Sequence, residues 1–190
     1  NTPLQLEITL VRMESHDPRN TAAAHLDAFY LTFPEARTRR FDGLIVTGAP
    51  IETLPFEAVD YWPELCALLD WSRDHVFSTL HVCWGAQAGL YHRYGIEKFP
   101  LADKIFGVFP HRVLDPRNRL LSGFDAVFPA PHSRHTETRA ADIEATPGLD
   151  LWAVSDEAGV YLAGSSDGRE VYVTGHPEYE WDTLKREYDR

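Results

Sequence analysis

The sequence predicts an α/β domain in which a mainly parallel sheet is flanked by helices. Strand-like and helix-like segments alternate over the first half of the chain, which is typical of parallel sheets covered by helices. Two short apolar runs end at Gly48 and at Cys83, as buried strands do before a turn. Three strand-like runs joined by turns follow in the last third, and they predict an antiparallel C-terminal addition to the sheet.

The first elements follow local patterns in the order in which they occur. Leu4–Arg12 alternates apolar and polar residues and predicts a strand. Asn20–Tyr30 predicts a helix, because capping residues precede a run of Ala, Leu and Phe. Phe41–Thr47 is closed by Gly-Ala-Pro and predicts a buried strand. Tyr61–Asp74 predicts the clearest helix, and its apolar stripe includes Cys66, which we expect to pack in the core.

The remaining elements are arranged around Cys83. Phe77–Val82 predicts a strand and Trp84–Tyr94 a helix, with Gly95 as its C-terminal cap. The last third contains the strand-like runs Leu151–Ser155, Gly159–Ala163 and Glu170–Thr174, and then a polar, helix-prone run over Tyr179–Arg190.

The bulk composition predicts a globular protein of one domain. The chain has 190 residues, of which 44% are apolar and 25% charged. No apolar run approaches the ~20 residues that span a bilayer, and no signal peptide is visible. Two cysteines do not make a disulfide framework, so we expect a reducing, cytoplasmic setting.

The net charge of −11 argues against nucleic-acid and anionic-membrane partners, which need a basic face. An anionic substrate would have to meet a local basic cluster instead. The candidates for that cluster are Arg93, Lys104, Arg134 and Arg190.

The strand–helix junction at Cys83 predicts a nucleophile elbow. Gly85 and Ala86 leave room for a sharp turn. A helix N-terminus favours the thiolate, so we expect the pKa of this thiol to be lowered. A buried core cysteine is the alternative interpretation.

A second chemical motif follows the last predicted strand, where His176-Pro177-Glu178 comes after Gly175. A cysteine nucleophile needs a base, and the base needs an orienting partner. His176 and Glu178 would complete a triad with Cys83. A turn with a surface histidine and a surface glutamate is the alternative.

Other motifs are weaker. His132 and His135 lie three residues apart without accompanying cysteine or acidic residues, so the sequence predicts no metal site. Pro131 and Ser133 favour a loop in this region, and Ser133 could be a polar contact in a pocket. His81, just before the elbow, is expected to be a packed or hydrogen-bonded core residue. Neither of the common Gly-rich nucleotide-binding motifs is present.

Six segments, in order along nearly the whole chain, carry a resemblance to a known family: Arg19–Thr21 (with His25-Leu26 and Phe29-Tyr30), Phe41–Pro50, Tyr61–Pro63, Val82–Ala88, Ala130–Arg134 and Val173–Tyr179. They resemble the homoserine O-acyltransferases of methionine biosynthesis, of the trans-succinylase type. The resemblance implies a class I glutamine amidotransferase-like (flavodoxin-like) fold. It also implies that further family segments precede and follow these 190 residues, so that the family's N-terminal strand and helix and its C-terminal extension are lacking here.

The resemblance implies a ping-pong acyl transfer. Cys83 would carry the acyl group as a thioester, His176 would act as general base, and Glu178 would orient the imidazole. Lys104, Ser133 and Arg190 fall on the family's substrate-binding positions. The implied substrates are acetyl-CoA, as a co-substrate rather than a bound cofactor, and L-homoserine, and the family suggests a homodimer.

Glu52 and Ser133 fall on positions that decide specificity in this family. A glutamate at the position of Glu52 goes with acetyl-CoA, because a fixed carboxylate repels and crowds the carboxylate of a succinyl group. The alternative is that Glu52 points to solvent.

Other functions stay open. Serine differs from homoserine by one methylene and could be the acceptor. A succinyltransferase of the same family, a glutamine amidotransferase-type hydrolase and a catalytically silent metabolite-binding domain are the remaining alternatives.

Overall fold

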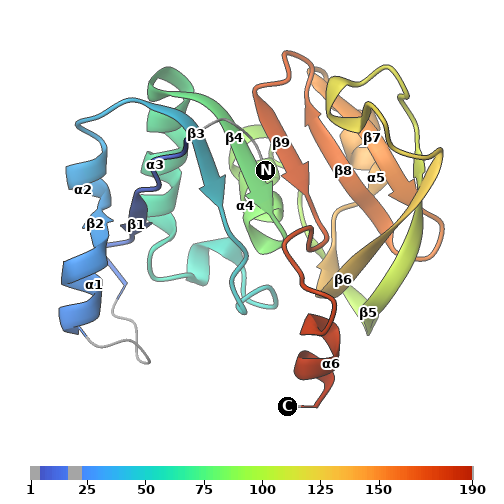
Figure 1. The fold of residues 1–190 in the computed structure, drawn as a ribbon, viewed down its shortest axis with the longest axis horizontal. Coiled ribbons are helices and arrows are strands. Elements are labelled where there is room, and N and C mark those ends of the chain that lie inside the picture. Colours follow the sequence, from blue (N-terminus) through green and yellow to red (C-terminus); the bar gives the residue numbers. More distant parts are fainter. Residues whose placement is uncertain (1–4, 17–22, 190) are drawn as a thin grey trace.

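A seven-stranded mixed sheet and a separate two-stranded sheet organise the chain (Figure 1). The computed structural model describes residues 5–16 and 23–189. The helices are α1 (Ala23–Phe29), α2 (Phe33–Ala36), α3 (Trp62–His75), α4 (Trp84–Tyr94), α5 (Ala140–Glu144) and α6 (Thr183–Tyr188), with short 3-10 turns η1 (Phe56–Ala58) and η2 (Arg119–Leu121). The strands are β1 (Leu10–Arg12), β2 (Tyr30–Thr32), β3 (Phe41–Val46), β4 (Val76–Val82), β5 (Phe99–Val113), β6 (Val127–Glu137), β7 (Leu149–Ser155), β8 (Gly159–Ser165) and β9 (Glu170–Val173).

The large sheet has the order β3-β4-β9-β8-β7-β5-β6. β3, β4 and β9 run parallel, and every other neighbouring pair is antiparallel. The predicted parallel sheet is therefore confirmed only for three strands, while the antiparallel addition is larger than predicted. β9 comes last in the sequence but lies between β4 and β8, which places the ends of β3, β4 and β9 side by side.

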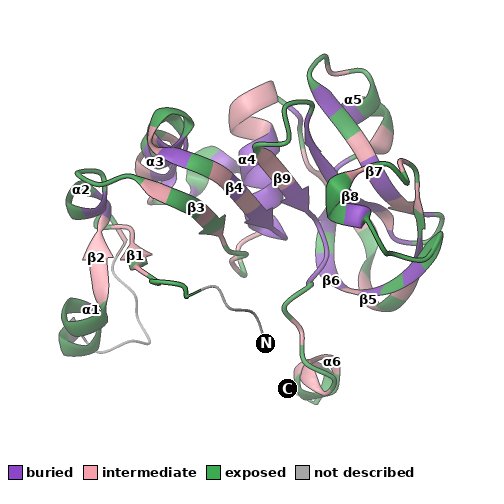
Figure 2. Ribbon diagram, turned by 45° about the horizontal axis from the view of Figure 1, so that its top comes forward, coloured by how far each residue is buried: buried purple, intermediate pink, exposed green. Residues whose placement is uncertain are grey.

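Helices cover one face of this sheet. The stripe of α3 packs with Trp84 and Ala88 of α4 in one core cluster, and α4 and α5 pack on β7, β8 and β9 in a second. On the other face the sheet curls, so that strands β6 to β9 and η2 pack on each other around Trp152, Tyr161 and Phe128. The buried residues of Figure 2 accordingly concentrate in β4, α4, β8 and β9.

The N-terminal part differs most from the prediction. Of the strand expected over Leu4–Arg12, Leu4 lies outside the described residues, and the rest forms a strand only over Leu10–Arg12. This strand pairs with β2, which the sequence did not predict. The helix expected over Asn20–Tyr30 ends at Phe29, and its start at Asn20 lies outside the described residues. An apolar groove of about 320 Å³ separates β1 from β3 and is lined by residues such as Val11, Leu44 and Trp84.

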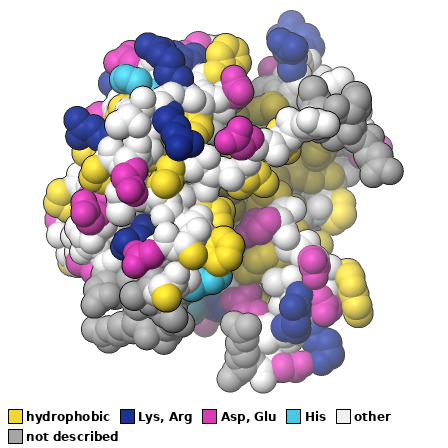
Figure 3. All heavy atoms as spheres, turned by 60° about the vertical axis from the view of Figure 1, so that its left-hand side comes forward, with side chains coloured by type: hydrophobic (Ala, Val, Ile, Leu, Met, Phe, Trp, Pro, Cys, Tyr) yellow, Lys and Arg dark blue, Asp and Glu magenta, His cyan; other side chains and the backbone are white. Residues whose placement is uncertain are grey.

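The surface carries mixed charge. Seen from the side of α1 and β1, acidic and basic side chains are interspersed, and apolar side chains lie at the bottom of a hollow (Figure 3). None of the helices within residues 5–16 and 23–189 combines the length and the apolar character needed to cross a bilayer.

Candidate active site

Cys83 sits in a strained turn between β4 and α4, as the elbow prediction requires. Its φ of 53° makes it the one non-glycine residue of positive φ among the residues that the structure describes. A Cβ on Gly85 would lie 2.5 Å from the carbonyl oxygen of Val46, so glycine lets the turn approach β3 closely. Cys83 N–H donates to the Val173 carbonyl at 2.7 Å, which ties the elbow to β9.

The thiol of Cys83 is buried, and its pKa differs from the prediction. Burial raises the pKa of the Cys83 thiol to about 12, with a further contribution from the carboxylate of Glu52. The backbone N–H of Trp84 and the charge of Arg134 act in the opposite direction but are weaker. The prediction of a lowered pKa is therefore wrong for this site at rest, because loss of solvation outweighs the helix N-terminus.

His176 and Glu178 lie just beyond β9. The Nδ1 atom of His176 is 2.8 Å from Oε1 of Glu178, which leaves Nε2 to exchange protons with a reacting group. His176 N–H donates to the Pro131 carbonyl at 3.0 Å, and its ring stacks on Tyr179 at 4.2 Å. The imidazole is thus held by a carboxylate, a main-chain contact and an aromatic ring.

These three residues open into one cavity of about 570 Å³. The cavity is also lined by Glu52, by Lys104 of β5, by Ser133 of β6, and by Thr47–Pro50, Thr53, His135, Tyr179 and Glu187. The structure therefore brings together all the predicted site residues except Arg190, which lies outside the described residues. Because β3, β4 and β9 are parallel, the cavity lies at their carboxyl ends, where α/β sheets bind ligands.

Ser133 lies in a strand and not in the predicted loop. β6 pairs antiparallel with β5, and the register places Phe106 opposite Ser133 after an irregularity between Pro100 and Ile105. That irregularity contains Lys104. The hairpin therefore delivers both predicted substrate-binding residues to the same cavity.

Glu187 of α6 is a cavity residue that the sequence did not reveal. Its carboxylate accepts hydrogen bonds from Ser133 Oγ at 2.5 Å, Lys104 Nζ at 3.1 Å and Tyr179 Oη at 2.9 Å. Burial opposes the ionisation of Glu187, but these donors outweigh it and hold its pKa below the usual range. The sequence offered only a polar helical run here, and nothing in that run pointed to an inward-facing side chain.

Glu52 lies at the cavity and not free in solvent. Its Oε1 accepts the backbone N–H of His135 at 2.9 Å. The carboxylate is therefore anchored on β6, next to the strand position of Ser133.

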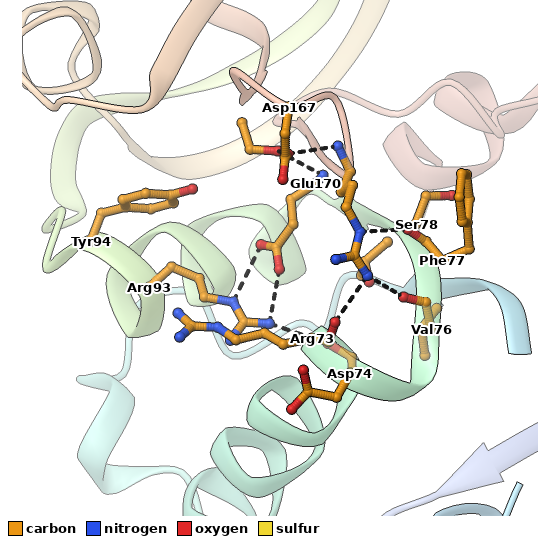
Figure 4. A pocket seen from close by; sticks show the side chains of 13 residues that line it. Arg73, Asp74, Val76, Phe77, Ser78, Arg93, Tyr94, Asp167 and Glu170 are labelled. Atoms are coloured by element: carbon orange, nitrogen blue, oxygen red, sulfur yellow. Dashed lines mark hydrogen bonds and ion pairs between the residues drawn. The ribbon is translucent and has the colours of Figure 1, made fainter. Parts of the chain in front are cut away.

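Arg93 and Arg134, the other described residues of the expected basic cluster, do not join Lys104. Arg93 lies at the amino ends of β4 and β9, where it pairs with Glu170 at 2.8 Å (Figure 4). The guanidinium of Arg134 is buried and donates to the carbonyls of Thr136 and Ala158. No basic cluster forms from these described residues.

The histidines hold no metal-ligand arrangement. His132 is buried and its Nε2 lies 2.9 Å from that of His111, whereas His135 is exposed. Over the part of the chain with described coordinates, no three His, Cys, Asp or Glu side chains gather as metal ligands would. His81 is fully buried and stacks on Tyr172, which confirms its predicted core role. Cys66 packs against the α3 core cluster, as predicted.

Comparisons with known sequences identify one family of similar proteins. The family model described as homoserine O-succinyltransferase matches residues 1–190. A homoserine O-acetyltransferase of Bacillus cytotoxicus is 62% identical over the whole chain, and one of Geobacillus kaustophilus is 54% identical. The chain spans 63% of the length of each of these relatives.

Solved structures share the fold at low sequence identity. A glutamine amidotransferase of Thermotoga maritima matches 97% of this chain and 82% of its own, with a TM-score of 0.67 at 13% identity. One of Methylobacillus flagellatus matches 97% of this chain and 75% of its own, with a TM-score of 0.64 at 14% identity. The class I glutamine amidotransferase-like fold is thereby confirmed.

Proposed function

This chain belongs to the homoserine O-succinyltransferase family, and from that premise we propose that it carries the acyl-transfer site of a homoserine O-acetyltransferase. The observation that supports this most is the single cavity shared by Cys83, His176, Glu178, Lys104 and Ser133. A nucleophile, a base with its orienting carboxylate, and polar groups for a substrate are the parts that acyl transfer through a covalent intermediate needs.

The first half-reaction acetylates Cys83. His176 Nε2 takes the proton of the thiol as Sγ attacks the thioester carbonyl of acetyl-CoA. The bond from that carbonyl to the CoA sulfur breaks, and the imidazolium returns its proton to the departing CoA thiolate. Because the resting thiol has a pKa of about 12, it needs this base during the attack and is not already ionised.

The second half-reaction releases the acetyl group to the acceptor. His176 removes the proton from the hydroxyl of L-homoserine, and the hydroxyl oxygen attacks the carbonyl of the acetyl-Cys83 thioester. The bond to Sγ breaks, the thiolate recovers a proton from the imidazolium, and O-acetylhomoserine leaves. Glu178, at 2.8 Å from Nδ1, stabilises the imidazolium in both steps.

The acceptor is an amino acid, and the cavity offers groups of both charges. Lys104 Nζ and the Glu187 carboxylate lie 3.1 Å apart, so they can face the carboxylate and the ammonium of a zwitterion respectively. Ser133, whose hydroxyl donates to Glu187, lines the same cavity. Arg190 is assigned to substrate binding from the family resemblance alone.

The donor is acetyl-CoA because Glu52 lies in the cavity. Its anchored carboxylate would repel and crowd the second carboxylate of a succinyl group. We propose further that the enzyme uses acetyl-CoA without a bound cofactor, works in the cytoplasm as a homodimer, and binds neither nucleic acid nor membrane.

The test is the intact mass of the complete protein mixed with acetyl-CoA or succinyl-CoA without acceptor, beside Cys83→Ser. We expect a gain of one acetyl group that is absent in Cys83→Ser and is discharged by homoserine. A gain from succinyl-CoA instead would overturn the choice of donor. No gain from either donor would overturn the acyltransferase, and a glutaminase assay would then be decisive for the hydrolase alternative.

A further inference from the structure

Lys98 holds the loop that carries Glu52, although it belongs to neither the catalytic groups nor the substrate-binding groups. Residues 47–55 between β3 and η1 form no helix or strand. Lys98, in the segment between α4 and β5, donates from Nζ to the carbonyl oxygens of Glu52 and Leu54, each at 2.6 Å. These contacts join parts of the chain that are 46 and 44 residues apart.

The environment of the Lys98 ammonium is unusual for a lysine. It is half-buried and lies 4.2 Å from the ring centroid of Phe56. Within the described ranges, no carboxylate oxygen comes within the 4.0 Å of an ion pair. Burying part of an ammonium group costs solvation free energy, and two neutral carbonyls and an aromatic ring compensate for it less than a carboxylate would. This cost points to a functional reason for the position of Lys98. Burial lowers the pKa of Lys98 to about 8, although Glu52 and Glu57 oppose this.

Glu52 is therefore fixed at two points. Its main-chain carbonyl is held by Lys98, and its carboxylate is held by the backbone N–H of His135 at 2.9 Å. Glu52 lines both the cavity of Cys83 and a second cavity of about 310 Å³, and Lys98 lines only the second. Lys98 thus contacts the loop from outside the cavity of Cys83, and Glu52 is the residue that connects it to that cavity.

We propose that Lys98 is a positioning residue that sets the acyl-donor selectivity by holding Glu52 in place. The inference rests on the proposed function and on the role of Glu52 in it. A carboxylate excludes a second carboxylate only while it cannot retreat, because repulsion weakens with distance and with solvation. Removing the clamp lets the loop yield and admits a succinyl group.

The first experiment compares kcat/KM for the two acyl donors, acetyl-CoA and succinyl-CoA, and not the overall rate with either one. In the complete protein, Lys98→Met removes the hydrogen-bonding N–H groups but keeps an unbranched side chain over Phe56, and Lys98→Arg retains N–H groups that can donate to the two carbonyls. We expect Lys98→Met to reduce the ratio of kcat/KM for acetyl-CoA to that for succinyl-CoA by about tenfold, and Lys98→Arg to restore most of it. The exposed Lys185, which pairs with Asp189, supplies the control Lys185→Met, whose ratio stays unchanged.

A double-mutant cycle with Glu52→Gly tests whether Lys98 acts through Glu52. In the Glu52→Gly background, Lys98→Met should leave the donor ratio unchanged. Equal loss of kcat/KM for both donors in Lys98→Met would mean a merely structural role and would overturn the inference. The same change of ratio with and without Glu52 would also overturn it.

The charge of Lys98 provides a second readout. The carboxylates around it are Glu52 of the loop, Glu57 of η1 and the neighbouring Glu97, and Tyr91 of α4 donates to Glu57. As pH rises through about 8 the ammonium loses its charge, so the donor ratio of the wild type should fall while that of Lys98→Arg stays level. A parallel profile in both proteins contradicts the clamp.

Different results would contradict the proposed acyltransferase function and the proposed role of Lys98. If the wild type forms no thioester with either donor, the proposed function fails. If the wild type acetylates Cys83 and discriminates between donors, but Lys98→Met leaves the ratio unchanged, only the role of Lys98 fails.

Discussion

At the scale of single residues, the proposed chemistry depends on a cysteine that is neutral at rest, Cys83, and on a histidine that several groups hold in place, His176. In the proposed mechanism a thiol with a raised pKa cannot attack without a base, so acetylation would require the correct orientation of His176. Among the described residues, Glu178 is the one carboxylate that pairs with this imidazole, and its side chain is 55% exposed. Water screens it, which makes its contribution smaller than that of a buried carboxylate.

We therefore predict that Glu178→Gln slows acetylation of Cys83 on the order of tenfold to a hundredfold, because the amide orients the ring but cannot stabilise the imidazolium. The measurement is CoA release in a single turnover with acetyl-CoA. Glu180→Gln is the matched control, since Glu180 is exposed and pairs with Arg186 and not with His176. Equal rates in Glu178→Gln and wild type would remove Glu178 from the mechanism.

A second prediction at this scale concerns the elbow. A Cβ at Gly85 would meet the Val46 carbonyl at 2.5 Å, whereas a Cβ at Gly43 of β3 would meet nothing closer than 3.9 Å. Gly85→Ala should lower the free energy of unfolding by about 1–3 kcal/mol and also impair acetylation, because the elbow must move away from β3. Gly43→Ala should do neither. Denaturant unfolding and CoA release measure the two effects, and a fully active Gly85→Ala protein contradicts the account.

At the scale of elements, the amino ends of β4 and β9 are joined by a buried charged network remote from the cavity (Figure 4). Arg93 of α4 pairs with Glu170 at 2.8 Å, and their side chains are 2% and 15% exposed. Burial opposes the ionisation of Glu170, but the His81 ring at 3.6 Å, the hydrogen bond from Tyr172 Oη and the charge of Arg93 lower its pKa to about 2.

Glu170→Gln should lower the free energy of unfolding by about 3 kcal/mol at pH 7, because it removes the closer and more buried of the two described carboxylates that pair with the buried Arg93, the other being Asp70 at 3.5 Å. The folded-state pKa lies below the ordinary value, so this stabilisation is present above about pH 4.5 and is lost as pH falls toward 2. Urea unfolding at pH 7 and at pH 3.5 measures this, with the exposed Glu157→Gln as control. A difference from wild type that does not shrink in acid would contradict the pKa assignment.

The elements also explain how far the sequence could predict the site. β3, α3, β4, α4 and the last strands have regular apolar patterns, and the cysteine elbow and the His-Pro-Glu turn follow from them. β5 and β6 contain prolines at positions 100, 110, 129 and 131, and because proline is unfavourable within most strands, these residues argued against a strand prediction. β6 tolerates Pro129 and Pro131 because it is an edge strand of the sheet. The prediction of a loop at Ser133 failed for that reason.

At the scale of the whole molecule, long-range packing decided what local patterns could not. The mixed sheet order, the inward side chain of Glu187 and the high pKa of Cys83 depend on contacts between segments far apart in the sequence. Local periodicity carries no information on such contacts. The resemblance to a known family provided the residue roles, and the structure brings the described residues concerned into one cavity.

The insertion of β9 between β4 and β8 also sets the order of events during synthesis. The ribosome makes Cys83 and the whole of α4 before β9, yet the backbone N–H of Cys83 is hydrogen-bonded to Val173, and His176 follows that residue. Until β9 has inserted between β4 and β8, a nascent chain therefore has the Cys83 thiol but lacks the base His176 beside it. Under the proposed function, reactivity toward acyl-CoA should appear abruptly once β9 and His176 have been made and have packed, and should not grow steadily with chain length.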